Sequence, residues 1–284
     1  MPWRKLGSND VIAGSAGFAA VAAAIVLTLV RSDAAAPDAS VTVTVPAPVS
    51  DRIYASPLAR GRPIVVIDAG HGGHDPGATS VSGQVREKDL TLALARELRD
   101  ELVKRGRVRV AMSRDDDSYL NLEQRAAVAR RLDAAMFVSL HMDSAANPAA
   151  RGASIYSLSD VASDAEAARF AAIENRGSSS DSGNGSVNAI LSDLAMQSEM
   201  SASADLAARL VHKSAGRFAL RPEPHRFAAF HVLRRADAPA VLFEAGYLSN
   251  ADDELLLRSP EHRAVIVLAI AQAIEADVAA RSTR

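Results

Sequence analysis

Short apolar runs alternate with amphipathic segments over most of the chain. Residues 64–67 form a β-branched apolar run that ends at an aspartate, which predicts a fully buried strand. Residues 90–105 carry leucines at four-residue steps, the spacing of one face of an amphipathic helix. Similar runs predict further strands at residues 108–112, 135–140, 153–156, 232–233 and 240–243. Further helices are predicted at residues 122–132, with Arg and Glu on the outer face, and at residues 260–278.

This alternation of strands and helices indicates βαβ units. Parallel strands joined by crossover helices build a sheet that is covered on both faces. We therefore expect an α/β fold, in which a single domain spanning residues 63–284 has a mostly parallel central sheet flanked by helices.

The pattern changes between residues 157 and 203. Residues 165–175 have a helical composition, residues 176–186 are polar and rich in Gly and Ser, and residues 187–200 predict a second helix. We interpret residues 157–203 as a helical insertion near the functional site.

The N-terminal region differs in kind from the rest of the chain. Residues 11–30 are apolar and uncharged, and Arg4 and Lys5 precede them, which is typical of a membrane anchor or a signal peptide. Both readings stay open for residues 1–31, with small residues at 34–36 as a cleavage site and the length of the run slightly favouring an anchor. Residues 32–62 are rich in Ala, Pro, Ser, Val and Thr and predict a linker. Either reading predicts export of the remaining chain.

The composition excludes several kinds of chemistry. The 284 residues include no cysteine, so thiol nucleophiles, thiolate zinc sites and iron–sulfur clusters are excluded. The net charge of −2 argues against nucleic-acid binding, which requires a basic excess. Any bound metal must be held by His and carboxylate side chains.

Candidate ligands follow the predicted strands. His71 follows the first strand, His141 follows the strand at residues 135–140, and Glu244 follows the strand at residues 240–243. The ends of parallel strands meet at one edge of a sheet, and Glu87, at the start of the first helix, is expected near the same edge. Two imidazoles and a carboxylate are a common ligand set for catalytic zinc, and a further carboxylate can transfer the proton of a water molecule.

Each of these features also has a simpler explanation. Glu87 is favoured in a first helical turn by the helix dipole alone, and the glycines around His71 can serve backbone geometry or a phosphate. A carboxylate at the end of a buried strand, as at Glu244, is costly unless it has a partner. We expect His74, Asp75 and Asp143 to support the ligands, and His231, which sits beside a predicted strand, to line the pocket. The remaining histidines are expected at the surface, namely His212, His225 and His262.

Four motifs in this order resemble the zinc-dependent N-acetylmuramoyl-L-alanine amidases of the cell-wall hydrolase type: IDAGHGGHDPGA, REKDLTLALA, SLHMDSA and VLFEAGYLSN. The resemblance covers nearly all of residues 63–280. It implies that His71, Glu87 and His141 bind Zn²⁺ and that Glu244 is the catalytic carboxylate. The implied reaction is cleavage of the peptidoglycan amide bond between N-acetylmuramic acid and L-alanine, in cell-wall remodelling or daughter-cell separation.

The insertion resembles the helical segment that covers the active site in the division amidases of Gram-negative bacteria. In that comparison Glu174 completes the zinc shell, and we hypothesise that it blocks the site until an activator protein displaces the helix. A solvated Glu on an amphipathic helix is the alternative. The resemblance also implies a periplasmic location, with the N-terminal segment attached to the inner membrane if it is not cleaved.

Two other functions remain open from the residues themselves. One is a zinc peptidase or deacylase that acts on another cell-wall amide. The other is a catalytically silent wall-binding protein, which would contain no zinc.

Overall fold

The computed structural model describes residues 51–176 and 188–282. The predicted signal or anchor segment, most of the predicted linker and nearly all of the polar Gly/Ser stretch lie outside the described residues. Within the part of the chain that is described, no helix is long and apolar enough to span a membrane.

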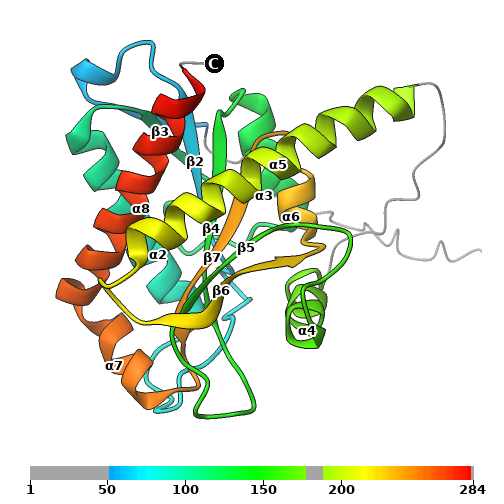
Figure 1. Cartoon of the computed structure of the whole chain (residues 1–284). Helices are drawn as coiled ribbons and strands as arrows, with labels where there is room; N and C mark the ends of the chain where they lie inside the picture. Colours follow the sequence, from blue (N-terminus) through cyan, green and yellow to red (C-terminus); the bar gives the residue numbers. More distant parts are fainter. Residues whose placement is uncertain (1–50, 177–187, 283–284) are drawn as a thin grey trace, which may run out of the picture. The chain divides into compact units, whose positions relative to one another are not determined.

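The described residues form a seven-stranded sheet with the order β1-β3-β2-β4-β7-β5-β6 (Figure 1). The strands β3, β2, β4 and β7 are parallel to one another, whereas β5 is antiparallel to β7 and β1 is antiparallel to β3. The predicted mostly parallel sheet is confirmed. The strands in chain order are β1 (Ile53–Tyr54), β2 (Ile64–Ala69), β3 (Arg109–Met112), β4 (Met136–Asp143), β5 (Ala153–Leu158), β6 (Leu220–Ala228) and β7 (Ala240–Tyr247).

Helices cover both faces of the sheet. In chain order the helical elements are η1 (Pro57–Ala59), α2 (Glu87–Arg105), α3 (Leu122–Arg131), α4 (Ala165–Glu174), α5 (Asn188–Ser214), α6 (His231–Arg234), α7 (Ala251–Arg258) and α8 (Pro260–Arg281). One core cluster joins the sheet to α2, α5 and α8, and a second cluster joins the opposite face to α3, α4 and α6. Strand β2 supplies side chains to both clusters, with Val65 and Ile67 in the first and Ile64 and Val66 in the second. Burial on both faces explains its continuous apolar run.

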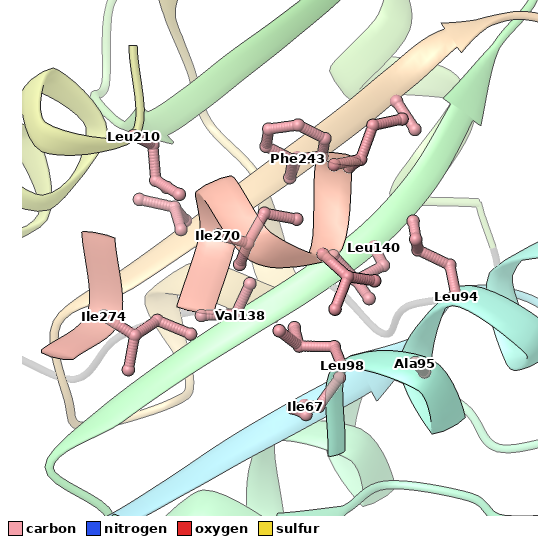
Figure 2. Packing of buried hydrophobic residues seen from close by; sticks show 14 of the residues in the cluster. Ile67, Leu94, Ala95, Leu98, Val138, Leu140, Leu210, Phe243, Ile270 and Ile274 are labelled. Atoms are coloured by element: carbon pink, nitrogen blue, oxygen red, sulfur yellow. The ribbon is translucent and has the colours of Figure 1, made fainter. Parts of the chain in front are cut away.

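The first core cluster is the larger one. Figure 2 shows Leu94 and Leu98 of α2 and Ile270 and Ile274 of α8 packed over the apolar side chains of the sheet. Leu210 from the C-terminal half of α5 joins the same layer. The second predicted helix of the insertion therefore continues beyond residue 200 to Ser214, and its last turns belong to the core.

The structure corrects two sequence predictions of local structure. Residues 232–233, predicted as a strand, lie in the short helix α6, where Val232 and Leu233 are both buried. Arg125 of α3 was predicted on the outer face but is buried, because it pairs with Asp68 of β2 at 2.9 Å. Four elements were not predicted, namely β1, η1, β6 and α7.

Candidate metal centre and active site

The carboxyl ends of three adjacent strands bring the predicted site residues together. His71 follows the end of β2, while His141 lies in β4 directly opposite Glu244 of β7. Glu87 is the first residue of α2, and its side chain reaches the same edge of the sheet. These residues therefore lie at the carboxyl ends of neighbouring strands, the edge where open α/β sheets bind their ligands.

The loop that carries His71 is held in an unusual conformation. His71 has a φ angle of 58°, in the left-handed region that residues with a side chain rarely adopt. Two buried arginines hold this loop by its carbonyl groups: Arg125 donates to the His71 carbonyl at 2.6 Å, and Arg114 donates to the Gly70 carbonyl at 2.8 Å. These arginines are functional supports that the sequence analysis missed, and no local sequence signal marks them.

The two histidines converge on the Glu87 carboxylate. Nδ1 of His141 lies 3.1 Å from one oxygen of Glu87, and Nε2 of His71 lies 3.0 Å from the other. The same carboxylate accepts the backbone N–H groups of Ala78 at 2.9 Å and Met142 at 3.0 Å. Glu87 is therefore fixed between both imidazoles at the beginning of α2.

Asp75 supports His71 from the other side of the ring. Its carboxylate lies 2.9 Å from Nδ1 of His71, which orients the ring so that Nε2 points toward the site. Nε2 itself is buried and has no hydrogen-bond partner among the described residues. Asp75 thus contacts His71, and its support of a metal ligand stays a prediction.

Glu174, the last residue of α4, reaches the same centre. One of its oxygens lies 3.4 Å from Nδ1 of His141 and 3.8 Å from Nε2 of His71. Ligand atoms of His71, His141 and Glu174 all lie within 4.8 Å of one another, close enough to hold one metal ion. The carboxylate of α4 therefore occupies the site rather than solvent.

The electrostatics are those of a dense group of acids and imidazoles. Burial lowers the pKa of His71, but the Glu87 carboxylate and Asp75 raise it more strongly, to about 11. Burial raises the pKa of Glu87, yet the two imidazoles lower it well below its usual range. Burial also raises the pKa of Glu174, in spite of both histidines.

Glu244 lies deeper than the other candidates. Its side chain is fully buried, and neither carboxylate oxygen has a hydrogen-bond partner among the described residues. Burial and then the nearby Asp143 raise the pKa of Glu244 well above its usual value. A buried carboxylate without a partner is costly, so its presence indicates a function rather than a contribution to stability.

Asp143 is also close to this carboxylate. Burial raises its pKa, the Tyr247 hydroxyl lowers it, and one of its oxygens accepts the Ser144 N–H at 2.6 Å. The structure therefore places Asp143 beside Glu244.

A cavity of about 690 Å³ opens over this edge of the sheet. It is lined by His71, Glu87 and His141 on the sheet side and by Ile173 and Glu174 of α4 on the other side. Glu244 does not line this cavity. Helix α4 thus stands over the candidate ligands in this conformation.

Of the other histidines, His212 is exposed as predicted and His262 is half-buried, whereas His74, His231 and His225 lie elsewhere than predicted. His74 is exposed and stacks on Tyr119, and among the described residues it makes no contact with His71, Glu87 or His141. His231 borders a separate hollow between α3, α5 and α6, although its neighbours Phe230 and Val232 line the main cavity. His225, expected at the surface, is half-buried in β6 with Nε2 at 2.9 Å from the Ser157 hydroxyl.

The donor set fits a divalent metal such as zinc. Imidazole nitrogens and carboxylate oxygens are ordinary zinc ligands, and the buried Nε2 of His71, 3.0 Å from a Glu87 oxygen, points at the place where the donors meet. The hydrogen bond from Asp75 to the far ring nitrogen is typical of metal-ligating histidines.

The fold and this site define a class, that of α/β proteins with a candidate metal centre at the carboxyl edge of a mostly parallel sheet. The comparisons with known proteins make the assignment narrower. The family model described as N-acetylmuramoyl-L-alanine amidase matches residues 65–276. The chain therefore belongs to the N-acetylmuramoyl-L-alanine amidase family.

Relatives and solved structures agree with this assignment. The chain is 35% identical to the amidase AmiC of Neisseria meningitidis over 75% of its own length and 52% of that protein. It is 32% identical to the amidase AmiA of Escherichia coli, with 75% of each chain covered. The catalytic domain of the amidase CwlV from Paenibacillus polymyxa matches with a TM-score of 0.57 at 29% identity, over 75% of this chain and 96% of that one. The chain spans about half the length of AmiC and of the Haemophilus influenzae AmiB.

Proposed function

We propose that this protein is a zinc-dependent peptidoglycan amidase that cleaves the bond between N-acetylmuramic acid and L-alanine of the stem peptide. The observation that carries the proposal is the convergence of His71, Glu87 and His141 beside the buried Glu244, in a chain of the amidase family. AmiA, which the chain covers over 75% of its length, is named as such an amidase.

The residues of the site have separate roles in the proposed reaction. His71, Glu87 and His141 would hold zinc, which supplies polarisation of the amide carbonyl and acidification of water when it is bound. Glu87 keeps its charge at neutral pH because its pKa is lowered by both imidazoles. Asp75 fixes the ring of His71 through Nδ1.

Glu244 is the group we assign to proton transfer. A carboxylate with a raised pKa is suited to accept a proton from the attacking water and to pass it to the leaving amine. The positive charge of a bound cation would lower the pKa of Glu244 from its value in this structure.

Glu174 is the group we assign to inhibition. Its carboxylate lies between the two imidazoles, and α4 covers the cavity, so substrate and Glu174 compete for one place. A fourth protein ligand closes a zinc site that catalysis needs open. Activation then requires a partner protein that withdraws the C-terminal end of α4.

The place of action follows from the substrate. Peptidoglycan lies outside the cytoplasmic membrane, so we propose that the chain is exported to the periplasm. Attachment to the inner membrane through residues 1–31 is part of the same proposal and rests on the apolar run at residues 11–30.

Product analysis tests the reaction. We expect the purified chain with zinc to release stem peptides that begin with L-alanine from purified sacculi. The Glu244→Ala variant should bind zinc and release almost none, whereas His71→Ala should fail to bind zinc. Another cleaved amide would identify a different zinc hydrolase, and a wild-type chain that binds no zinc would identify a silent wall-binding protein.

A second comparison tests inhibition. Glu174→Ala should release stem peptides several-fold faster than the wild type without an activator, while Glu223→Ala, an exposed glutamate of β6, should match the wild type. Equal basal rates in Glu174→Ala and the wild type would contradict the role of Glu174.

A further inference from the structure

Two aromatic rings stand at the cavity without a role in the proposed reaction. The rings of His74 and Tyr119 stack with their centroids 4.0 Å apart at an interplanar angle of 39°. Both residues line the cavity that holds His71 and Glu87, and Tyr119 is 39% exposed. We call these two side chains the aromatic pair.

The aromatic pair is held rigidly from beneath. Lys88 of α2 is buried, and its ammonium donates to the Gly73 carbonyl at 2.8 Å and to the Asp117 carboxylate at 2.6 Å. Asp117 in turn accepts the N–H of Gly73 at 2.9 Å. One buried charge therefore joins the loop before His74 to the loop before Tyr119.

The two loops also pack too closely for larger residues. A Cβ on Gly72 would lie 2.2 Å from the Ser118 carbonyl oxygen, and a Cβ on Gly73 would lie 2.9 Å from the backbone nitrogen of Tyr119. Both glycines have positive φ angles, 129° and 59°. An exposed ring pair that is fixed this tightly is preorganised, which reduces the entropy lost when a ligand binds.

The surroundings of the aromatic pair favour a neutral ligand. Two carboxylates that neighbour the aromatic pair in sequence are paired, since Asp117 lies 2.6 Å from the Lys88 ammonium and Asp75 lies 2.9 Å from Nδ1 of His71. These two carboxylates therefore offer no unpaired charge to the charged groups of a stem peptide. A sugar ring carries no charge on its C–H face, and this face is attracted to the negative face of an aromatic ring.

We propose that the aromatic pair is a saccharide subsite, which stacks on a sugar ring of the glycan strand while the amide bond lies at the metal centre. This inference rests on the proposed function for the identity of the glycan. Tyr119 and His74 are thus specificity-determining residues that recognise the polymer, and they take no part in bond cleavage.

The test uses soluble strands of β-1,4-linked N-acetylglucosamine, a neutral glycan probe that carries no stem peptide and therefore no scissile bond. We expect the full chain and the Tyr119→Phe variant to bind these strands with similar affinity, because phenylalanine keeps the stacking face. Tyr119→Ala and His74→Ala should bind about tenfold more weakly, the loss typical of one truncated aromatic contact. Leu58→Ala, which removes an exposed apolar side chain on η1, is the matched control and should bind like the wild type.

The outcomes separate the subsite from the reaction. Unchanged glycan affinity in both alanine variants, or weakened binding of free stem peptide alone, would overturn the saccharide subsite even if the wild type cleaves sacculi. A wild type that binds glycan strands through Tyr119 but cleaves no amide would leave the subsite standing and reject the proposed reaction. If Tyr119→Ala fails to fold, as judged by thermal unfolding, His74→Ala and Tyr119→Phe decide the question.

Discussion

Asp68 carries a charge at the centre of the sheet, close to the loop that presents His71. Arg125 pairs with this carboxylate at 2.9 Å, and the hydroxyls of Ser113 and Ser139 donate to it at 2.5 Å and 2.7 Å. Burial alone would raise the pKa of Asp68, but Arg125 lowers it below the ordinary value. The same guanidinium donates to the carbonyls of Ala69 and His71, so one buried ion pair positions a candidate metal ligand.

Replacing Asp68 by Asn should therefore cost about 3–5 kcal/mol of the free energy of unfolding, because Arg125 would remain buried without its partner. Urea denaturation at neutral pH measures this loss. The exposed pair of Asp51 and Arg131 is the control, and Asp51→Asn should cost at most about 1 kcal/mol. Equal losses in the two variants would show that the buried ion pair contributes no more to the free energy of unfolding than the exposed pair does.

The pH dependence of stability has a definite sign at Asp68. Its pKa is lower in the folded chain than in the unfolded chain, so its contribution is present above the unfolded pKa of about 3.9 and is lost as pH falls through the lowered value. The gap in stability between the wild type and Asp68→Asn should shrink in that acid range.

At the scale of single residues, the sequence indicates the candidate metal ligands better than it indicates the residues that position them. His71, His141 and Glu87 could be chosen from the sequence, because strand ends and a helix start determine where such side chains point. Arg125 could not, because a charged residue on a helix is placed outside unless its partner is known, and Asp68 lies 57 positions earlier. His74 shows the converse, since proximity in sequence to His71 did not bring it to the candidate metal centre.

Helix α4 is attached at both of its ends. At its N-terminus, Asp164 caps the helix and pairs with Arg226 of β6, and Glu166 pairs with Arg221 at 2.9 Å. At its C-terminus, the Asn175 amide donates to the Ala229 carbonyl at 2.7 Å and accepts the His231 N–H at 2.8 Å. Ion pairs hold the far end, and two neutral hydrogen bonds hold the end that carries Glu174.

Asn175→Ala should accordingly loosen the C-terminal end of α4 and give a basal rate, without an activator, above that of the wild-type chain. Loss of two hydrogen bonds, worth about 1–3 kcal/mol together, corresponds to roughly a 5- to 150-fold shift toward the open form. Release of stem peptides from sacculi measures the rate. Asn147→Ala removes an exposed asparagine that only caps a local turn, and it should leave the rate unchanged. A basal rate in Asn175→Ala no higher than in the Asn147→Ala control would argue against this end of α4 as the part that opens.

The elements that the sequence did not predict, or predicted wrongly, have physical explanations. Strand β6 contains Pro222 and Pro224, which argue against a strand, but it lies at the edge of the sheet, where one side of the strand needs no partner. Residues 232–233 are too few to show a helical or strand period. Both side chains are buried in the short helix α6 and not in an extended strand. Helix α7 did carry a usable signal, since Asn250 and the two following aspartates are typical of a helix start.

The whole described domain converges on one edge of the sheet. The candidate ligands come from the loop after β2, from α2 and from β4, and these parts are joined by contacts far apart in sequence. Helix α8, near the end of the chain, is fastened to α2 by Arg263 with Glu97 and by Glu275 with Arg105, each at 2.7 Å. The position of Glu87 at the start of α2 thus depends on packing contributed by the last helix, which no local pattern of the sequence reveals.

Zinc binding should therefore stabilise the entire domain rather than one loop. At a free zinc concentration of about 100 times its Kd, the expected gain is about 2.7 kcal/mol, or roughly 5–10 °C in Tm for a domain of this size. Thermal unfolding of the chelator-treated chain, with and without added zinc, measures the shift. His141→Ala should abolish the shift, while Glu244→Gln should retain it, because Glu244 is assigned to proton transfer and not to the metal. His225→Ala removes a half-buried histidine of β6 that is held by Ser157, so its shift should equal that of the wild type. A full zinc-dependent shift of Tm in His141→Ala would show that the metal does not bind at this edge of the sheet.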